Sequence, residues 1–166
     1  MEVQVLINGL LKMDELHANL LEIMERKKQA ILNRNYEELM STLSLESKMV
    51  KAIEECEKDL LGLAQGFLHS KGIKSQLELT ISEILRLVFD PEEKRMLDET
   101  RKKLGNRLIE LKQVNELNQE LITQSLSFID FSLNLMIGGE DEGPIYSPPT
   151  SQDRKPAHKS IFDTRA

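Results

Sequence analysis

Apolar residues recur at steps of three and four along two long stretches of the chain, which is the period of an amphipathic helix. In the first stretch, from about Val3 to Leu32, they are Leu6, Leu10, Met13, Leu20, Ile23, Met24 and Ile31. In the second, from about Tyr36 to Ser70, they are Leu39, Leu43, Val50, Ile53, Leu60, Ala64 and Phe67. The pattern predicts two long helices, each with an apolar face for a shared core.

The residues between these two stretches predict a tight turn. The sequence "NRN", Asn33 to Asn35, suits both a left-handed helix end and a helix cap. Glu38 follows Asn35 by three residues, which is a capping-box pattern with asparagine at the cap. Two long helices joined by so short a turn fold back as an antiparallel hairpin. We therefore expect Ile7 to lie near residues 63–67.

Two more helices are predicted after Gly72, which can end the second helix in a left-handed conformation. The stretch "SQLELTISEILRLVF" predicts a shorter third helix that starts near Ser75. Asp90 can cap a fourth helix and Pro91 fits its first turn, so this helix should run from Pro91 to about Ile137. The predicted fold is all-α, an antiparallel long-helix hairpin or bundle of about four helices.

The composition changes after the fourth helix. Four of the five prolines lie there, Pro144, Pro148, Pro149 and Pro156, and apolar residues are sparse. Such a segment buries too little surface to offset the entropy of ordering it. The sequence therefore predicts a helical domain at 1–138 and a flexible tail at 139–166.

Charge and composition exclude several classes of protein. The net charge of −6 argues against nucleic-acid binding, which needs a basic surface. No apolar run reaches the roughly 18 to 20 residues of a membrane span, so membrane insertion is not expected. The amino terminus lacks the basic region of a signal peptide. A cytoplasmic protein is the simplest interpretation.

The chain offers little for catalysis or for holding a metal or cofactor. Asp14 and His17 have the i, i+3 spacing of metal sites in helical bundles, but no second such pair exists in the sequence. Cys56 is the single cysteine, and burial as a small apolar residue is its usual role. Gly-rich phosphate loops and serine elbows are absent from the sequence. We therefore expect a protein without metal or cofactor that is not an enzyme.

The fourth predicted helix has two apolar stripes. The first contains Leu104, Leu108, Leu111, Asn115, Asn118, Ile122, Leu126, Ile129, Leu133 and Met136. The second contains Val114, Leu117, Leu121, Phe128, Phe131 and Leu135. A third helix of about four turns is too short to cover a helix of roughly 70 Å. Part of the second stripe should therefore stay open, and Leu117, Leu121, Phe128, Phe131 and Leu135 are the predicted partner-binding residues.

The first stripe is interrupted by Asn115 and Asn118, and two interpretations are open. Buried asparagines can fix the register between helices of one protein. They can instead give polar specificity to a contact with a partner helix. On the same stripe Leu126 is expected to be core, so that Leu126→Ala would cost roughly 2 to 5 kcal/mol of stability.

Parts of the sequence resemble one known family. The stretch "LLEIMERKKQAILNRNYEELMSTLSLESKMVKAIEECE", Leu20 to Glu57, resembles the amino-terminal hairpin of the FlgN-type flagellar export chaperones. The stretch "VNELNQELITQSLSFIDFSLNLM", Val114 to Met136, resembles their carboxy-terminal helix. The final "IFDTRA", Ile161 to Ala166, is similar to the end of Gram-positive members.

The resemblance implies a cytosolic chaperone of type III secretion in bacterial motility. Such a protein binds hook–filament junction proteins, keeps their helical termini soluble and delivers them to the export gate. It also implies that a tyrosine near the end of the last helix contacts the cytoplasmic domain of the gate, and Tyr146 is the candidate here. An ordinary solvent-exposed tyrosine is the other interpretation of Tyr146.

A different class of function fits the helical pattern as well. The chain could be a structural coiled-coil adaptor or scaffold with a permanent helical partner, and homo-oligomerisation is compatible with the same stripes. Concentration-dependent dimerisation that buries the second stripe would favour the adaptor. A monomer that binds an isolated client terminus would favour the chaperone.

Overall fold

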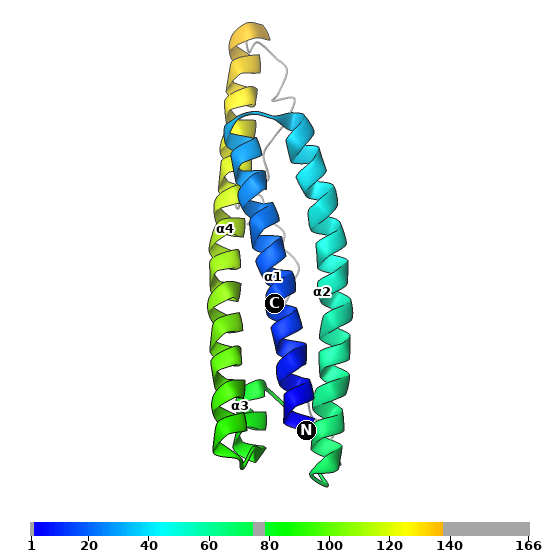
Figure 1. The fold of residues 1–166 in the computed structure, drawn as a ribbon. Coiled ribbons are helices and arrows are strands. Elements are labelled where there is room, and N and C mark those ends of the chain that lie inside the picture. The colour runs from blue at the N-terminus through cyan, green and yellow to red at the C-terminus, as the bar shows by residue number, and fades with distance from the viewer. Residues whose placement is uncertain (1, 75–78, 138–166) are drawn as a thin grey trace, which may run out of the picture. The chain divides into compact units, whose positions relative to one another are not determined.

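The computed structural model describes residues 2–74 and 79–137, and these form helices and turns, as the sequence predicted. The helices are α1 (Glu2–Leu32), α2 (Tyr36–Ser70), α3 (Ile81–Ile84), the 3-10 helix η1 (Leu85–Leu87) and α4 (Pro91–Ile137), shown in Figure 1. The chain divides into two compact units, Met1–Asn118 and Gln119–Ala166, so α4 contributes to both. The predicted boundary after residue 138 and the predicted tail lie outside the described residues.

Helices α1 and α2 form the predicted antiparallel hairpin, and Figure 1 shows them running side by side. Ile7 near the start of α1 shares a buried cluster with Phe67 near the end of α2, and Leu63 packs against that cluster. The expected proximity of these residues is confirmed. The hairpin therefore places the two ends of α1 and α2 that are farthest apart in sequence next to each other.

The turn between α1 and α2 has the predicted cap, with two differences. The left-handed residue is Arg34, at φ 54°, and not one of the asparagines. Asn35 caps α2, since its Oδ1 accepts a hydrogen bond from the backbone N–H of Glu38 at 3.1 Å. The Glu38 carboxylate pairs with Arg26 at 2.7 Å, while the Asn35 N–H donates to the Ala30 carbonyl at 2.9 Å. The predicted capping box is therefore half formed.

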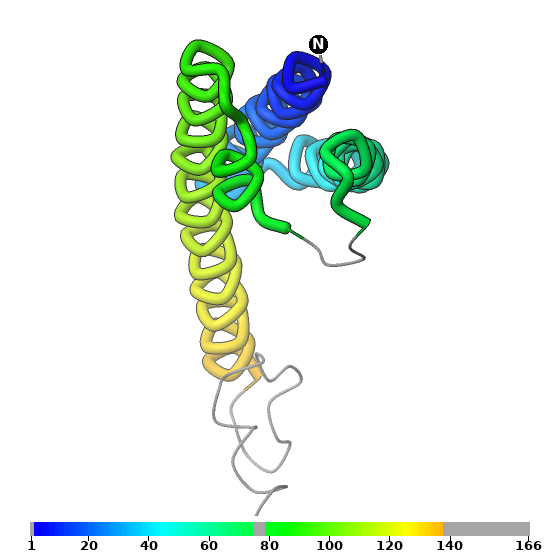
Figure 2. The backbone as a smooth tube through the Cα atoms, turned by 90° about the horizontal axis from the view of Figure 1, so that it is seen from below, coloured from blue at the N-terminus to red at the C-terminus, as the bar shows by residue number. Residues whose placement is uncertain are grey.

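The third helix is shorter than predicted and starts later. Residues 75–78, where its start was expected, lie outside the described chain, and α3 begins only at Ile81. Its cap is Thr80, whose Oγ1 accepts from the Glu83 N–H at 3.3 Å while the Glu83 carboxylate accepts from the Thr80 N–H at 2.8 Å. Figure 2 shows α3 and η1 beside the first turns of α4. The fourth helix begins at Pro91 as predicted, and Asp90 accepts from the Glu93 N–H at 2.8 Å.

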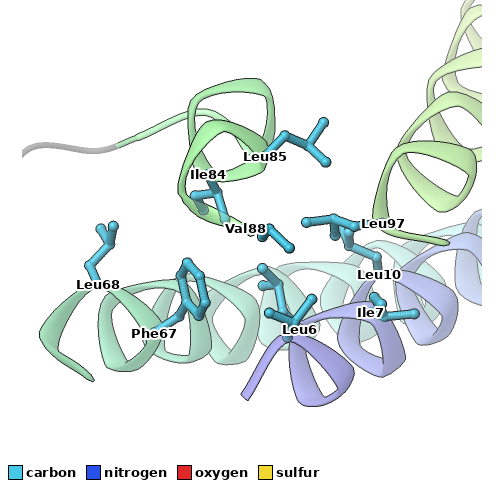
Figure 3. Packing of buried hydrophobic residues seen from close by; sticks show 10 residues of the cluster. Leu6, Ile7, Leu10, Phe67, Leu68, Ile84, Leu85, Val88 and Leu97 are labelled. Carbon is cyan, nitrogen blue, oxygen red and sulfur yellow. The ribbon is translucent and has the colours of Figure 1, made fainter. Parts of the chain in front are cut away.

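The main core of the first unit is built by all of its helices (Figure 3). Its buried members are Val3, Leu6, Ile7, Leu10, Phe67, Leu68, Ile84, Leu85, Val88 and Leu97. A smaller cluster contains Leu20 and Met24 of α1 and Leu111 of α4, with Met49 and Ile53 of α2 packed against it. Together the clusters join α1 to both α2 and α4.

The buried face of α2 is rotated away from part of the predicted stripe. Leu43 and Val50, which were predicted to face the core, are exposed, whereas Thr42 and Cys56 are buried. The side of α2 that faces α1, here called the seam, contains Thr42 and Cys56, which are two seven-residue repeats apart. Seven residues is the spacing at which a helix stays in contact with a neighbouring helix. Leu43 and Val50 lie roughly 90° from that seam at about 100° per residue. The Thr42 hydroxyl is satisfied inside the helix, because it donates to the Leu39 carbonyl at 2.7 Å.

The close approach of α1 and α2 at Gly9 gives a test of the register of the hairpin. A Cβ at Gly9 would lie 3.0 Å from Leu60 Cδ1 and 3.2 Å from Leu63 Cδ1. A Cβ at Gly105 of α4 would meet nothing within 4 Å. Alanine favours a helix over glycine by about 1 kcal/mol, so Gly105→Ala should stabilise the protein by about that amount.

In the Gly9→Ala variant the contact with the two leucines should cancel most of this gain, because extra methyl groups in packed interfaces force neighbours to move. Denaturant unfolding of both variants gives the difference, which we expect to be about 1 kcal/mol. An equal gain in the two variants would mean that α1 and α2 are not in the register described.

Candidate partner-binding segment of helix α4

The described part of the second unit is the last portion of α4, residues 119–137, which we call the terminal segment. Its apolar residues form two stripes along the helix. The phenylalanine stripe contains Leu121, Phe128, Phe131 and Leu135. The aliphatic stripe contains Ile122, Leu126, Ile129, Leu133 and Met136. The centres of the two stripes are roughly 140° apart around the helix axis at about 100° per residue.

The phenylalanine stripe is open to solvent. Phe131 has 59% of its surface exposed, Phe128 and Leu135 are exposed as well, and Leu121 is half-buried. Leu117, the remaining predicted partner-binding residue, belongs to the first unit and is also exposed. Large apolar side chains exposed next to one another on a protein surface are typical of a binding site.

The aliphatic stripe is not a core face in this segment, contrary to the sequence prediction. Leu126 and Leu133 are only half-buried, and Ile129 and Met136 are 45% and 85% exposed. Neither core cluster of the described chain contains a residue of the terminal segment. The core-type role predicted for Leu126 is therefore wrong, because the helices that cover this side of α4 bury Leu97 and Leu111 instead.

The asparagines of the first predicted stripe have different surroundings. Asn118 is buried in the first unit, and its Nδ2 donates a hydrogen bond to the Met24 carbonyl of α1 at 3.0 Å. Its Oδ1 is buried without a hydrogen-bond partner among the described residues. Asn115 is half-buried. A polar contact between α1 and α4 at Asn118 is what the register interpretation requires, so this observation favours that interpretation for Asn118.

Charged residues almost disappear from α4 where the terminal segment begins. Residues 91–118 contain thirteen charged side chains, whereas residues 119–137 contain Glu120 and Asp130. The change in charge density is a signal in the sequence for the exposed ends of both stripes. The spacing of apolar residues takes no account of charge density, and it places Ile129 and Met136 on the same stripe as Leu126.

Two serines fill the narrow sector between the stripes. The Ser125 hydroxyl donates to the Leu121 carbonyl and the Ser132 hydroxyl to the Phe128 carbonyl, both at 2.9 Å. Each hydroxyl therefore has its hydrogen bond within the helix, so covering this sector leaves no donor unsatisfied. The two stripes and the serine sector make one arc of about 220°. Gln124 also lies within this arc, between Phe131 and Leu135 around the helix axis, and its Nε2 donates to Glu120 Oε1 at 3.3 Å.

Asp14, His17 and Cys56 have structural roles. Asp14 forms ion pairs with α4, and the His17 ring nitrogen Nδ1 lies 2.7 Å from the Met13 carbonyl oxygen. Cys56 is a buried free thiol. Within residues 2–74 and 79–137, no group of three or more His, Cys, Asp or Glu side chains is arranged to hold a metal ion. Tyr146 lies outside the described residues.

Asp14 lies in a buried charge network between α1 and α4. Its exposed fraction is 4%, and its carboxylate accepts from Arg107 Nε at 2.6 Å. The Lys103 ammonium lies 3.2 Å from the other carboxylate oxygen. Burial acts to raise the pKa of Asp14, but the hydrogen bonds and positive charges of Arg107 and Lys103 outweigh it and hold this pKa below its usual value. The network holds α1 and α4 together through charge.

None of the helices in the described part of the chain combines the length and the apolar character needed to cross a membrane.

Comparison with known proteins identifies the family. The sequence model described as "FlgN protein" matches residues 1–154. A Bacillus subtilis (strain 168) protein named "Uncharacterized protein YvyG" is 28% identical over 166 residues, which cover 100% of both chains. No solved structure gives a significant match. Since the family match spans nearly the whole sequence, the chain belongs to the FlgN family of flagellar export chaperones.

Proposed function

We propose that this protein is a cytosolic chaperone of flagellar type III secretion that binds hook–filament junction proteins and keeps them soluble before export. The main support is the exposed phenylalanine stripe of the terminal segment, in which Phe131 has 59% of its surface exposed. Membership of the FlgN family supports the class of client. No catalytic group is needed, because holding an apolar helix away from other copies of the client requires affinity alone.

The binding mode that we propose is a helix in a groove. The terminal segment is roughly 28 Å long, so it can pair with about five turns of an amphipathic client helix. The phenylalanine stripe would cover the apolar face that the client helix buries in the assembled filament. The apolar contacts would give affinity, and the polar residues beside the stripe would limit the partners accepted.

Replacing Phe131 by alanine tests the proposal. We expect Phe131→Ala to weaken binding of a purified hook–filament junction protein from the same organism by about 2 kcal/mol, roughly 30-fold in Kd, as for a buried aromatic anchor. Isothermal titration calorimetry measures the change. Because Phe131 is exposed in the free protein, its thermal unfolding should hardly change.

Phe89→Ala is the matched control, since Phe89 is an exposed phenylalanine outside the terminal segment. Its substitution should leave client binding unchanged. Equal affinities of the Phe131→Ala variant and the unsubstituted protein would rule out the phenylalanine stripe as the client site.

The export gate is the proposed second partner. By resemblance to the family, Tyr146 would contact the cytoplasmic domain of the gate. This contact would use a part of the chain separate from the phenylalanine stripe, so loss of gate binding should not weaken client binding.

A structural adaptor with a permanent helical partner is the second candidate, and the exposure of both stripes favours it to the same degree. Sedimentation of the purified chain separates the two functions. A chaperone should be a folded monomer that binds its client reversibly, whereas an adaptor should remain in a fixed-ratio complex throughout purification.

A further inference from the structure

We propose that the client encloses the terminal segment from both sides, with one amphipathic helix on the phenylalanine stripe and a second helix on the aliphatic stripe. This inference rests on the proposed function and specifies the partner: a chain that supplies two helices at once. The proposed function itself requires a single client helix on the phenylalanine stripe and does not require a second helix on the aliphatic stripe.

The exposure of the aliphatic stripe is the first observation. Leu97 and Leu111, nearer the start of α4, are buried in the two core clusters of the first unit. Ile129 and Met136 are exposed instead, and Leu126 and Leu133 are only half-buried. A client on the phenylalanine stripe alone would leave these residues in water.

The geometry of the two stripes is the second observation. One packed helix covers a face of about 100°. The apolar arc of the terminal segment spans about 220° at about 100° per residue, so one helix is too narrow to cover it. Two neighbouring helices are wide enough, and they would meet over Ser125 and Ser132, whose small hydroxyls are bonded to their own helix.

The distribution of charge is the third observation. A helix that is apolar on most of its surface is normally buried. Glu120 and Asp130 are the charged residues of the terminal segment, and the exposed Ser127 and Asn134 lie outside the apolar arc. Ser127 and Asn134 mark the sector that would stay in water when the two client helices are bound.

A second copy of this chain is a poorer occupant than the client. A symmetric dimer uses the same patch on both copies. Pairing through the phenylalanine stripe would leave both aliphatic stripes open, and pairing through the aliphatic stripe would leave both phenylalanine stripes open. One client chain with two helices covers both stripes of one chaperone.

Three aspartate substitutions test the inference with the purified hook–filament junction protein of the same organism as the probe. Phe131→Asp changes the phenylalanine stripe, Ile129→Asp the aliphatic stripe, and Ser127→Asp the polar sector as a control. We expect the first two to raise Kd at least tenfold and Ser127→Asp to change it less than threefold. Circular dichroism checks that each variant remains helical.

If Ile129→Asp lowers the helix content, Met136→Ser tests the aliphatic stripe in its place, because Met136 is the most exposed member of that stripe. We expect this variant to raise Kd about fivefold. Loss of binding in Phe131→Asp alone would overturn the two-helix inference and leave the proposed function standing. Unchanged binding in both stripe variants would overturn the proposed function itself. A dimer of the free chain that Ile129→Asp converts to a monomer would identify the aliphatic stripe as a self-interface, which also overturns the inference.

Discussion

Replacing Leu97 by alanine should destabilise the folded protein by about 3 to 4 kcal/mol, since large-to-small changes in a packed core lose both apolar burial and packing. Leu97 has 0% of its surface exposed. It lies in one cluster with residues of α1, α2 and α3, as Figure 3 shows. Urea unfolding followed by circular dichroism measures the loss.

Leu108→Ala is the matched control, because it is the same substitution in the same helix at an exposed position. Its effect should be below about 1 kcal/mol, as for most surface substitutions. Similar losses in the two variants would mean that Leu97 does not sit at the centre of a packed cluster.

The contrast between Leu97 and Leu126 shows what periodicity predicts and what it omits. Leu97 lies on the same side of α4 as Leu126 at about 100° per residue, and the helix is present throughout. Periodicity identifies the side of a helix that carries apolar residues, but not which part of that side another helix covers. In the first unit α1 and α3 supply the cover, and these contacts join residues far apart in sequence. Only the structure therefore separates Leu97 from Leu126.

Helix ends were predicted well where the signal is local. The Asn35 cap, the Asp90 cap and the left-handed Gly72 depend on residues within one turn, and all three are present. The third helix was predicted too long because its apolar residues continue upstream of Thr80. The Thr80–Glu83 capping box in "TISE" is a local signal that would have placed its start correctly.

The polar contacts between helices could not be predicted from the sequence. Asp14 and Arg107 are 93 residues apart, and neither stands out from its charged neighbours on an amphipathic helix. Lys27 is buried in the same way, through an ion pair with Glu46 at 3.0 Å. A charged side chain is normally assigned to the surface. A charged side chain can be buried when a residue of opposite charge on another helix pairs with it. The sequence pattern of one helix does not identify that residue.

Arg107→Met should cost about 3 kcal/mol of stability at neutral pH, the lower end of the range for breaking a buried ion pair. Methionine keeps much of the apolar stem of arginine, so the main loss is the charge that balances the buried Asp14. Lys103 still reaches Asp14 at 3.2 Å but is more exposed to water, and it compensates only in part. Urea unfolding at pH 7 gives the value.

Arg95→Met is the control on the same helix. Arg95 pairs with Glu92 at 2.5 Å and with Glu99 at 2.6 Å, and all three side chains are exposed. Exposed pairs contribute little, because water hydrates the charges as well when they are separate. Its stability should therefore stay close to that of the unsubstituted protein. A loss as large as that of Arg107→Met would mean that the burial of Asp14 does not set the cost.

The pH dependence of the Arg107→Met variant separates the loss of charge from the loss of packing. In the unsubstituted protein the pKa of Asp14 is below its usual value, so its ionised form stabilises the fold above the unfolded pKa of about 3.9. This contribution is lost as the pH falls through the lower, folded pKa. In the variant, the charge of Arg107 no longer opposes the effect of burial, so the pKa of Asp14 is higher than in the unsubstituted protein. Acid then protonates the Asp14 carboxylate and removes the cost of its buried charge. The difference in unfolding free energy between the two proteins should therefore be largest at neutral pH and shrink as the pH falls below about 4. A difference that stays constant from pH 7 to pH 3 would assign the cost of Arg107→Met to lost packing.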